Sequence, residues 1–272
     1  MRNMAFKIIV GFFVVLFIFL TLFPVFVMLI ASLKSDVQIQ NSFAWFTHPM
    51  HFDNYSIAFM QIYHYILNSV IVTLGVVCLS LIISLLAGYS FAKFEYPGKN
   101  ILFFAMIALM MVPGILTLVP QFIISKNLHI LNTYIVQILP LTAADSILST
   151  FLIKTFIEDQ PRSLFEMIEM EGAGVTKTLV HLVAPLCVPV LAIVAIMNTT
   201  SAWNNYLWPL VSANQGNVRP VIIAIMNLVV PVGRSKGVSF AAYIISSVPL
   251  LLIYSVFTKQ LVSGLTSGAL KA

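Results

Sequence analysis

Residues 161–185 read PRSLFEMIEMEGAGVTKTLVHLVAP, and this charged stretch interrupts a chain that is apolar over most of its length. Three glutamates stand close together at Glu166, Glu169 and Glu171, with Arg162 before them and Lys177 after them. Long apolar runs flank the stretch on both sides. Because ionised side chains are costly inside a bilayer, the stretch is predicted to be a hydrated loop between two membrane spans.

The composition of the whole chain indicates an integral membrane protein. Apolar residues make up 60% of the 272 residues, charged residues only 8%, and the mean hydropathy is +1.01, values that do not suit a water-soluble domain. A bilayer span needs about 20 apolar residues, so this length has room for about six helices in a single membrane domain. We predict an all-α fold over residues 1–272, with spans at about 8–31, 68–92, 101–125, 133–157, 184–208 and 238–258.

The basic residues predict an orientation, because loops rich in lysine and arginine face the cytoplasm. The first apolar run is too long for a secretion signal and lacks a small-residue cleavage site, so we expect a retained helix. With the N-terminus inside, nine of the 14 basic residues are cytoplasmic and five are outside. The nine are Arg2, Lys7, Lys93, Lys99, Lys154, Arg162, Lys177, Lys259 and Lys271, and the five are Lys34, Lys126, Arg219, Arg234 and Lys236. Both termini and residues 158–183 are then expected in the cytoplasm.

A short helix is predicted inside this cytoplasmic loop. Ser163 and Glu166 have the spacing of a capping box, and Gly172 supplies a residue that enters the left-handed conformation at a helix end. An apolar stripe at helical spacing is formed by Leu164, Met167 and Ile168. Such a helix either docks into a groove of a partner protein or lies flat on the bilayer, and three glutamates facing anionic lipid argue against the second alternative.

The spacing of the loop resembles the EAA loop of binding-protein-dependent ABC importer permeases. Glu166 is followed six positions on by Gly172, ten later by Leu182 and three later by Pro185. Further stretches, in order along nearly the whole chain, are similar to the carbohydrate-uptake branch and to the smaller permease of maltose-type sugar transporters. They are Asn54-Tyr55, Asn68-Ser69, Ala87–Ala92, Met110–Pro113 with Pro120, Leu131–Thr133, Ile138–Pro140, Trp203–Leu210 and Gly268–Lys271.

This resemblance implies a type I importer permease fold and a division of labour among several chains. It implies a heterodimer with a second, related permease, two cytoplasmic ATPase subunits that hold ATP and Mg²⁺, and an extracytoplasmic sugar-binding protein, all at a prokaryotic cell membrane. The 161–173 helix is then the contact through which ATP-driven closure produces alternating access. This coupling role is carried over to Ser163, Leu164, Glu166, Met167, Ile168, Glu169, Glu171, Gly172 and Ala173.

We expect no catalytic residue and no cofactor in this chain. A phosphate loop needs glycines before a Gly-Lys-Ser/Thr sequence. The nearest stretch, 172–178, has Thr176 where the glycine before Lys177 is required. Cys78 and Cys187 lack the spacing of metal ligands, so we also expect no metal site. The basic residues form no cluster, which argues against nucleic acid as a partner.

Polar residues inside the predicted spans are the candidates for a solute pathway, because a polar solute needs hydroxyls and amides along its route. They are Asp145, Ser146, Asn198, Thr199, Thr200, Ser201, Asn204 and Asn205. Hydrogen bonds between helices would explain the same residues, with Asp145 a structural acid. Trp203 and Trp208 are expected to be anchors at the membrane interface.

Two other functions compete with a sugar-importer permease. The first is an ion-coupled secondary carrier that uses Asp145 as its coupling group. The missing internal repeat and the loop motif argue against it. The second is a permease of an importer for amino acids or phosphate, against which the sugar-branch stretches argue.

Overall fold

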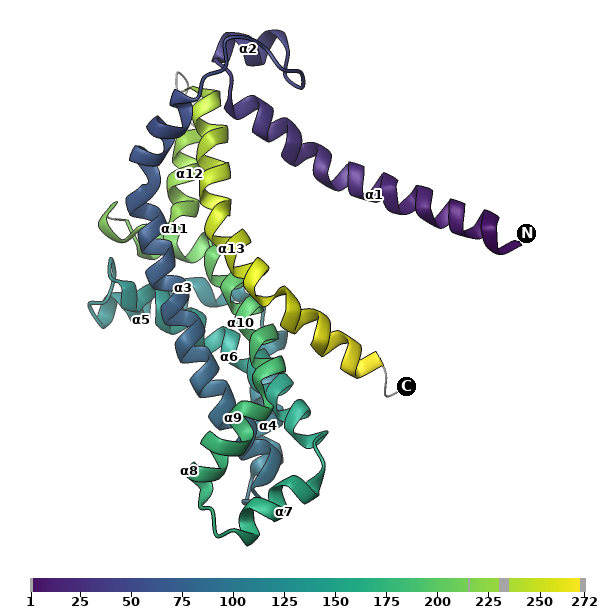
Figure 1. Cartoon of the computed structure of the whole chain (residues 1–272). Coiled ribbons are helices and arrows are strands. Elements are labelled where there is room, and N and C mark those ends of the chain that lie inside the picture. The colour runs from purple at the N-terminus through teal and green to yellow at the C-terminus, as the bar shows by residue number, and fades with distance from the viewer. Residues whose placement is uncertain (1, 215, 230–234, 270–272) are drawn as a thin grey trace. The chain divides into compact units, whose positions relative to one another are not determined.

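The computed structural model describes residues 2–214, 216–229 and 235–269, and it contains no β-strand within these ranges (Figure 1). Arg234 and Lys271, which entered the predicted orientation, lie outside the described residues. The elements are α1 (Arg2–Ser32), α2 (Asp36–Asn41), α3 (Asp53–Lys93), α4 (Lys99–Ala108), the 3-10 turn η1 (Leu109–Met111), α5 (Gly114–Asn127), α6 (Tyr134–Glu158), α7 (Arg162–Met170), α8 (Val175–Thr178), the π-helical turn η2 (Leu179–Val183), α9 (Ala184–Leu186), α10 (Val188–Trp203), α11 (Leu207–Ser212), the 3-10 turn η3 (Gly216–Val218), α12 (Val221–Val229) and α13 (Lys236–Ala269).

Four described helices are long and apolar enough to cross a membrane, and the number is six if each of two bent helix pairs counts as one span. The four are α1, α3, α6 and α13. The pairs are Lys99–Met111 with Gly114–Asn127, bent by 102°, and Val175–Leu186 with Val188–Trp203, bent by 74°. The all-α membrane fold is therefore confirmed, but the third and fifth predicted spans are broken helices rather than straight ones.

Prolines explain where the bent pairs break. A residue before a proline is driven out of the helical region of backbone conformation. Val112, which precedes Pro113, accordingly has an extended backbone at φ −79° and ψ 115°, and α5 begins anew at Gly114. In the second pair, Pro185 and Pro189 remove two amide donors around the turn at Cys187. The π-helical turn η2 ends at Val183, and the three residues of α9 separate it from this break.

Two compact units make up the chain, and the first comprises Met1–His64 with Ala224–Val248. In this unit the Lys34 side chain is only 1% exposed and donates hydrogen bonds to the carbonyls of Ser42, Phe43 and Trp45. The segment between α1 and α3 contains α2, which is six residues long and carries a capping box at Ser35. The second span starts earlier than predicted, because α3 already begins at Asp53.

The second unit comprises Tyr65–Ile223 with Pro249–Ala272 and contains both bent pairs. Its helices approach closely at two glycines of α3. A Cβ atom at Gly75 would lie 2.6 Å from the Ile138 side chain, and one at Gly88 would lie 2.8 Å from the Ile153 side chain. Small residues at helix contacts are the usual means of tight packing in a bilayer, where lipid removes most of the hydrophobic driving force. Glycine therefore fixes the contact of α3 with α6.

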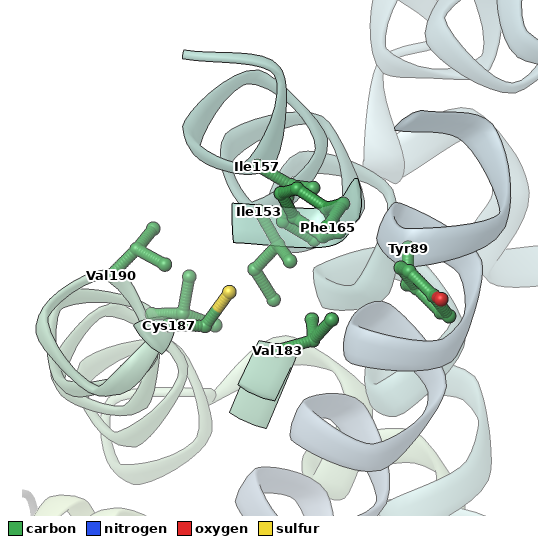
Figure 2. Packing of buried hydrophobic residues seen from close by; sticks show 8 residues of the cluster. Tyr89, Ile153, Ile157, Phe165, Val183, Cys187 and Val190 are labelled. Atoms are coloured by element: carbon green, nitrogen blue, oxygen red, sulfur yellow. The ribbon is translucent and has the colours of Figure 1, made fainter. Parts of the chain in front are cut away.

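A buried apolar cluster lies at the end of the second unit where α3, α6 and α7 meet (Figure 2). We call it the α7-end core, and its members are Tyr89, Ile153, Ile157, Phe165, Val183, Cys187, Val190 and Val194. They come from α3, α6, α7, η2 and α10 together with the turn between α9 and α10. The core therefore joins α7 to three membrane helices.

The segment between α11 and α12 is held against α3 and α6 by polar side chains. Asn68 donates its amide to the carbonyls of Asn217 (3.1 Å) and Arg219 (2.9 Å). Ser69 accepts from the Val221 amide at 2.8 Å, and Gln137 donates to the Val218 carbonyl at 2.7 Å. This is a structural role for the Asn68-Ser69 pair. The helix α12 that follows was not among the predicted elements.

Candidate functional site

The predicted loop helix is present as α7, but its beginning differs from the prediction. Pro161 is the N-cap residue, and no side chain forms a capping hydrogen bond there. The capping box expected from Ser163 and Glu166 is therefore wrong: Ser163 already lies inside the helix. Gln160 precedes a proline, which disfavours a helical conformation and sets the boundary two residues earlier. At the other end, Gly172 adopts φ 72° as expected.

The buried face of α7 is centred on Phe165, a residue outside the stripe that the sequence predicts. Phe165 is 7% exposed within the α7-end core, and the Lys93 ammonium lies 3.5 Å from the centroid of its ring. Leu164 packs at the edge of the same core. The expected apolar stripe is thus only partly correct, because Leu164 and Ile168 are half-buried whereas Met167 is 64% exposed.

The opposite face of α7 presents apolar and acidic side chains together. Met167 and Met170 are 64% and 89% exposed, which is unusual for long apolar side chains beside charged ones. All three glutamates of the loop are exposed as well. We call this surface the outer face of α7, and it consists of Glu166, Met167, Met170 and Glu171. Glu169 is exposed too, but it follows Phe165 by four residues and therefore lies on the Phe165 side of the helix.

A short connection joins α7 to α10. The amides of Gly172 and Ala173 donate to the carbonyls of Glu169 (2.9 Å) and Ile168 (3.2 Å), which closes the end of the helix. Only Gly174 then separates Ala173 from α8, and helical turns continue to the break at Cys187. From Val175 to Leu186 every residue of this connection is in a helical turn.

A cavity of 330 Å³, which we call the inner cavity, lies between η1, α6 and α10. Its polar lining consists of Asp145 and Ser149 from α6 and Asn198 and Ser201 from α10. The Ser201 hydroxyl donates to Asp145 Oδ1 at 3.0 Å. Asp145 Oδ2 is buried and has no hydrogen-bond partner among the described residues, although buried carboxylate oxygens are normally satisfied.

The Asn198 side chain connects three helices beside this cavity. Its amide nitrogen donates to Ser80 Oγ at 2.6 Å and to Ser149 Oγ at 3.2 Å. Ser84 adds a bond from α3 to the Ser146 carbonyl of α6 at 3.3 Å. Interhelical hydrogen bonding, one of the two explanations open from the sequence, therefore applies to Asn198.

A second cavity of 310 Å³, the outer cavity, lies between α5, α6 and the start of α11. Thr117 and Gln121 from α5 and Asn205 supply its polar side chains. Trp208 also lines it, and the indole donates to the Val136 carbonyl at 2.6 Å. Trp203 and Trp208 are 5% and 6% exposed, so both are buried in the protein and the expected interface anchors are wrong.

The eight pathway candidates from the sequence divide by position. Asp145, Asn198 and Ser201 line the inner cavity, and Asn205 lines the outer one. Thr200 instead bonds to Tyr254 at 2.5 Å, and Asn204 donates to the Thr200 carbonyl at 3.0 Å. Ser146 and Thr199 are buried and line neither cavity. The lining residues Thr117, Gln121 and Ser149 were not selected from the sequence.

Comparison with protein-family models gives the class of this protein. Residues 80–267 match the model of the binding-protein-dependent transport system inner membrane component, and the chain belongs to this family. The resemblance inferred from the loop spacing is therefore confirmed. The chain is a membrane permease.

Individual relatives cover nearly the whole chain. It is 29% identical over 258 residues to the arabinooligosaccharides transport system permease protein AraQ of Bacillus subtilis, covering 93% of this chain and 91% of AraQ. It is 30% identical over 255 residues to the diacetylchitobiose uptake system permease protein NgcG of Streptomyces coelicolor, covering 91% and 83%. A chain of a bacterial ABC transporter that imports the acidic polysaccharide alginate has the same fold, with a TM-score of 0.83, 20% identity and coverage of 96% and 98%.

Proposed function

We propose that this chain is one of two related permease subunits of an ATP-driven sugar importer. Its family and its relatives named for sugar uptake support this assignment. In this proposal two ATPase subunits bind ATP and Mg²⁺ in the cytoplasm, and an extracytoplasmic binding protein delivers the sugar. The chain contributes half of the pathway and both of its termini face the cytoplasm.

The observation that carries the coupling role is the outer face of α7. Two methionines that are 64% and 89% exposed on a loop among glutamates form a surface suited to a partner protein. Flexible methionine side chains fill irregular grooves well. In our proposal Met167 and Met170 enter a groove of the ATPase, and Glu166 pairs with a basic group at its rim.

The α7-end core supports the transmission of movement from this contact. Phe165 is anchored among residues of α3, α6 and α10, and the connection through α8 and η2 is helical. When the ATPases close on ATP, a pull on α7 acts on the half of the fifth span that precedes its bend. Repositioning α10 relative to α6 changes the inner cavity, because Ser201 and Asn198 lie on α10 and Asp145 on α6. This is how alternating access would arise.

The first test identifies the companions of the chain. The chain is tagged at its C-terminus, extracted in mild detergent from its own cells, and its stoichiometric companions are identified by mass spectrometry. We expect an ATPase and a second permease. A protein that purifies alone and still transports its solute in liposomes would overturn the proposed function.

The second test removes the apolar part of the outer face. The double substitution Met167→Glu with Met170→Glu is expected to abolish co-purification of the ATPase while the second permease remains bound. Burying two methionines contributes about 3 kcal/mol or more, so ATPase affinity should fall by about a hundredfold or more. Asn100→Glu, which adds a carboxylate at an exposed position in the first turn of α4, is the matched control and should retain the ATPase. Normal ATPase recovery with the double variant would refute the role of α7.

A further inference from the structure

The two cavities form a continuous series along one face of α6. Ala144 lines both of them, and Leu141 of the outer cavity and Leu148 of the inner cavity lie one turn to either side of it. Asp145 adjoins Ala144 on the inner side. The bend of the third span lies between the same cavities, since Met110 lines the inner one and Gly114 the outer one. Broken helices beside cavities are frequent at the solute sites of transporters.

The polar groups of the outer cavity are neutral, whereas the inner cavity contains a carboxylate. Thr117, Gln121 and Asn205 offer a hydroxyl and two amides. In the inner cavity Asp145 is the single ionisable residue among the described lining residues, and no basic residue is described in the lining of either cavity. The hydroxyl of Ser201 donates a hydrogen bond to Asp145 Oδ1, and Asp145 Oδ2 has no partner among the described residues.

An ionised carboxylate imposes a charge preference on a narrow route through a membrane. Two unit charges interact several times more strongly near protein than in bulk water, because the effective dielectric constant is lower. A carboxylate oxygen accepts hydrogen bonds from hydroxyl or ammonium donors, and it repels another carboxylate or a sulfonate. A charge inside a membrane protein is tolerated where it faces a cavity rather than lipid, and Asp145 lines the inner cavity.

We propose that Asp145 is a specificity-determining residue that makes the inner cavity a site for uncharged or amino-bearing sugar units and a barrier to acidic ones. This inference rests on the proposed function and adds the chemical class of the solute. The outer cavity receives the sugar through neutral hydrogen bonds. The inner cavity then selects against negative charge before the sugar leaves the α6 face.

The test measures the local potential with a reporter thiol in the assembled transporter. Ala144→Cys places the thiol at the junction of the cavities, and Cys78→Ala removes the exposed native thiol while Cys187, which is fully buried, remains. Its rates of reaction with trimethylammonioethyl and with sulfonatoethyl methanethiosulfonate are compared in proteoliposomes. Leu128→Cys, 62% exposed and lining neither cavity, gives the reference ratio for the two reagents.

We expect the cation-to-anion rate ratio at Ala144→Cys to exceed the reference ratio by about tenfold, which corresponds to about 1.4 kcal/mol. Adding Asp145→Asn should lower the ratio to the reference value. Adding Asp145→Glu, which keeps the charge, should leave the ratio about tenfold above the reference value. An unchanged ratio with Asp145→Asn would overturn the proposal, and so would failure of Ala144→Cys to react with either reagent. The companions found by co-purification test the proposed function separately, so the two ideas fail on different measurements.

Discussion

The two bent spans of the second unit differ in what surrounds their bends. Beside the 102° bend, Leu109, Met111 and Ile115 are 58%, 84% and 61% exposed. Around the 74° bend, Val183 and Cys187 are fully buried and Val190 is 6% exposed. Prolines cause both breaks, yet one break borders the cavities and the other lies in a packed core. Proline chemistry thus fixes where a span bends, and packing decides whether the bend leaves space or links helices.

The largest loss of stability that this comparison predicts is for substitution of Phe165, which packs α7 into the core beside the second bend. Phe165→Ala should destabilise the folded protein by about 3–5 kcal/mol, because a large buried ring leaves a cavity. Leu116→Ala, beside the first bend and 67% exposed, is the matched control and should change stability by less than about 1 kcal/mol. Reversible unfolding in mixed micelles measures both. Equal losses would remove the distinction between a packed and an open bend.

A smaller effect is expected from adding one methyl group at a glycine of each region. Gly88→Ala places Cβ 2.8 Å from the Ile153 side chain and should cost about 1–3 kcal/mol through overpacking of α3 against α6. Gly114→Ala, at the start of α5, meets no atom within 4 Å. That variant should remain within about 0.5 kcal/mol of the original protein. Thermal melting of the two variants side by side would sharpen the comparison, and a stable Gly88→Ala variant would contradict the close contact.

The smallest expected loss of stability comes from the hydrogen bonds that link α3, α6 and α10. Asn198→Ala removes the hydrogen bonds to Ser80 and Ser149 and should cost about 0.6–1.7 kcal/mol, the range for interhelical bonds in membranes. Asn204→Ala, an exposed amide six residues further on, serves as the control. The same unfolding assay applies. If both variants lost the same stability, Asn198 would not be the link between α3, α6 and α10.

Local signals in the sequence predicted much of this fold. The fourth span was expected at 133–157 and is found as α6 at Tyr134–Glu158, because Thr133 caps the helix and charged residues follow its end. The loop helix was expected from its charges and from Gly172, whose conformation is indeed left-handed. Spacing alone also identified the family. These are properties of short segments, which sequence patterns describe well.

The remaining features depend on how segments meet. Phe165 rather than Met167 faces inward because its ring packs in the α7-end core and contacts the Lys93 ammonium. The residues of the loop alone do not show which side of α7 meets this core. Thr117 and Gln121 line a cavity because the third span turns by 102° at Pro113. A proline predicts a break but not its angle. Trp208 is buried because its indole finds the Val136 carbonyl, a partner distant in sequence.

Gly237, in the first turn of α13, has a consequence for how this sequence can change. A Cβ atom at this position would lie 2.6 Å from the amide nitrogen of Asn54 and would collide with the Lys34 carbonyl. Asn54 itself donates to the carbonyls of Ser32 (2.9 Å) and Lys34 (3.0 Å), so it has little freedom to move away. The residues tolerated at position 237 therefore depend on the side chain at position 54. A side chain at 237 would require both the Lys34 backbone and the Asn54 amide to move, and it would therefore disturb the contact that joins the end of α1 to the start of α3.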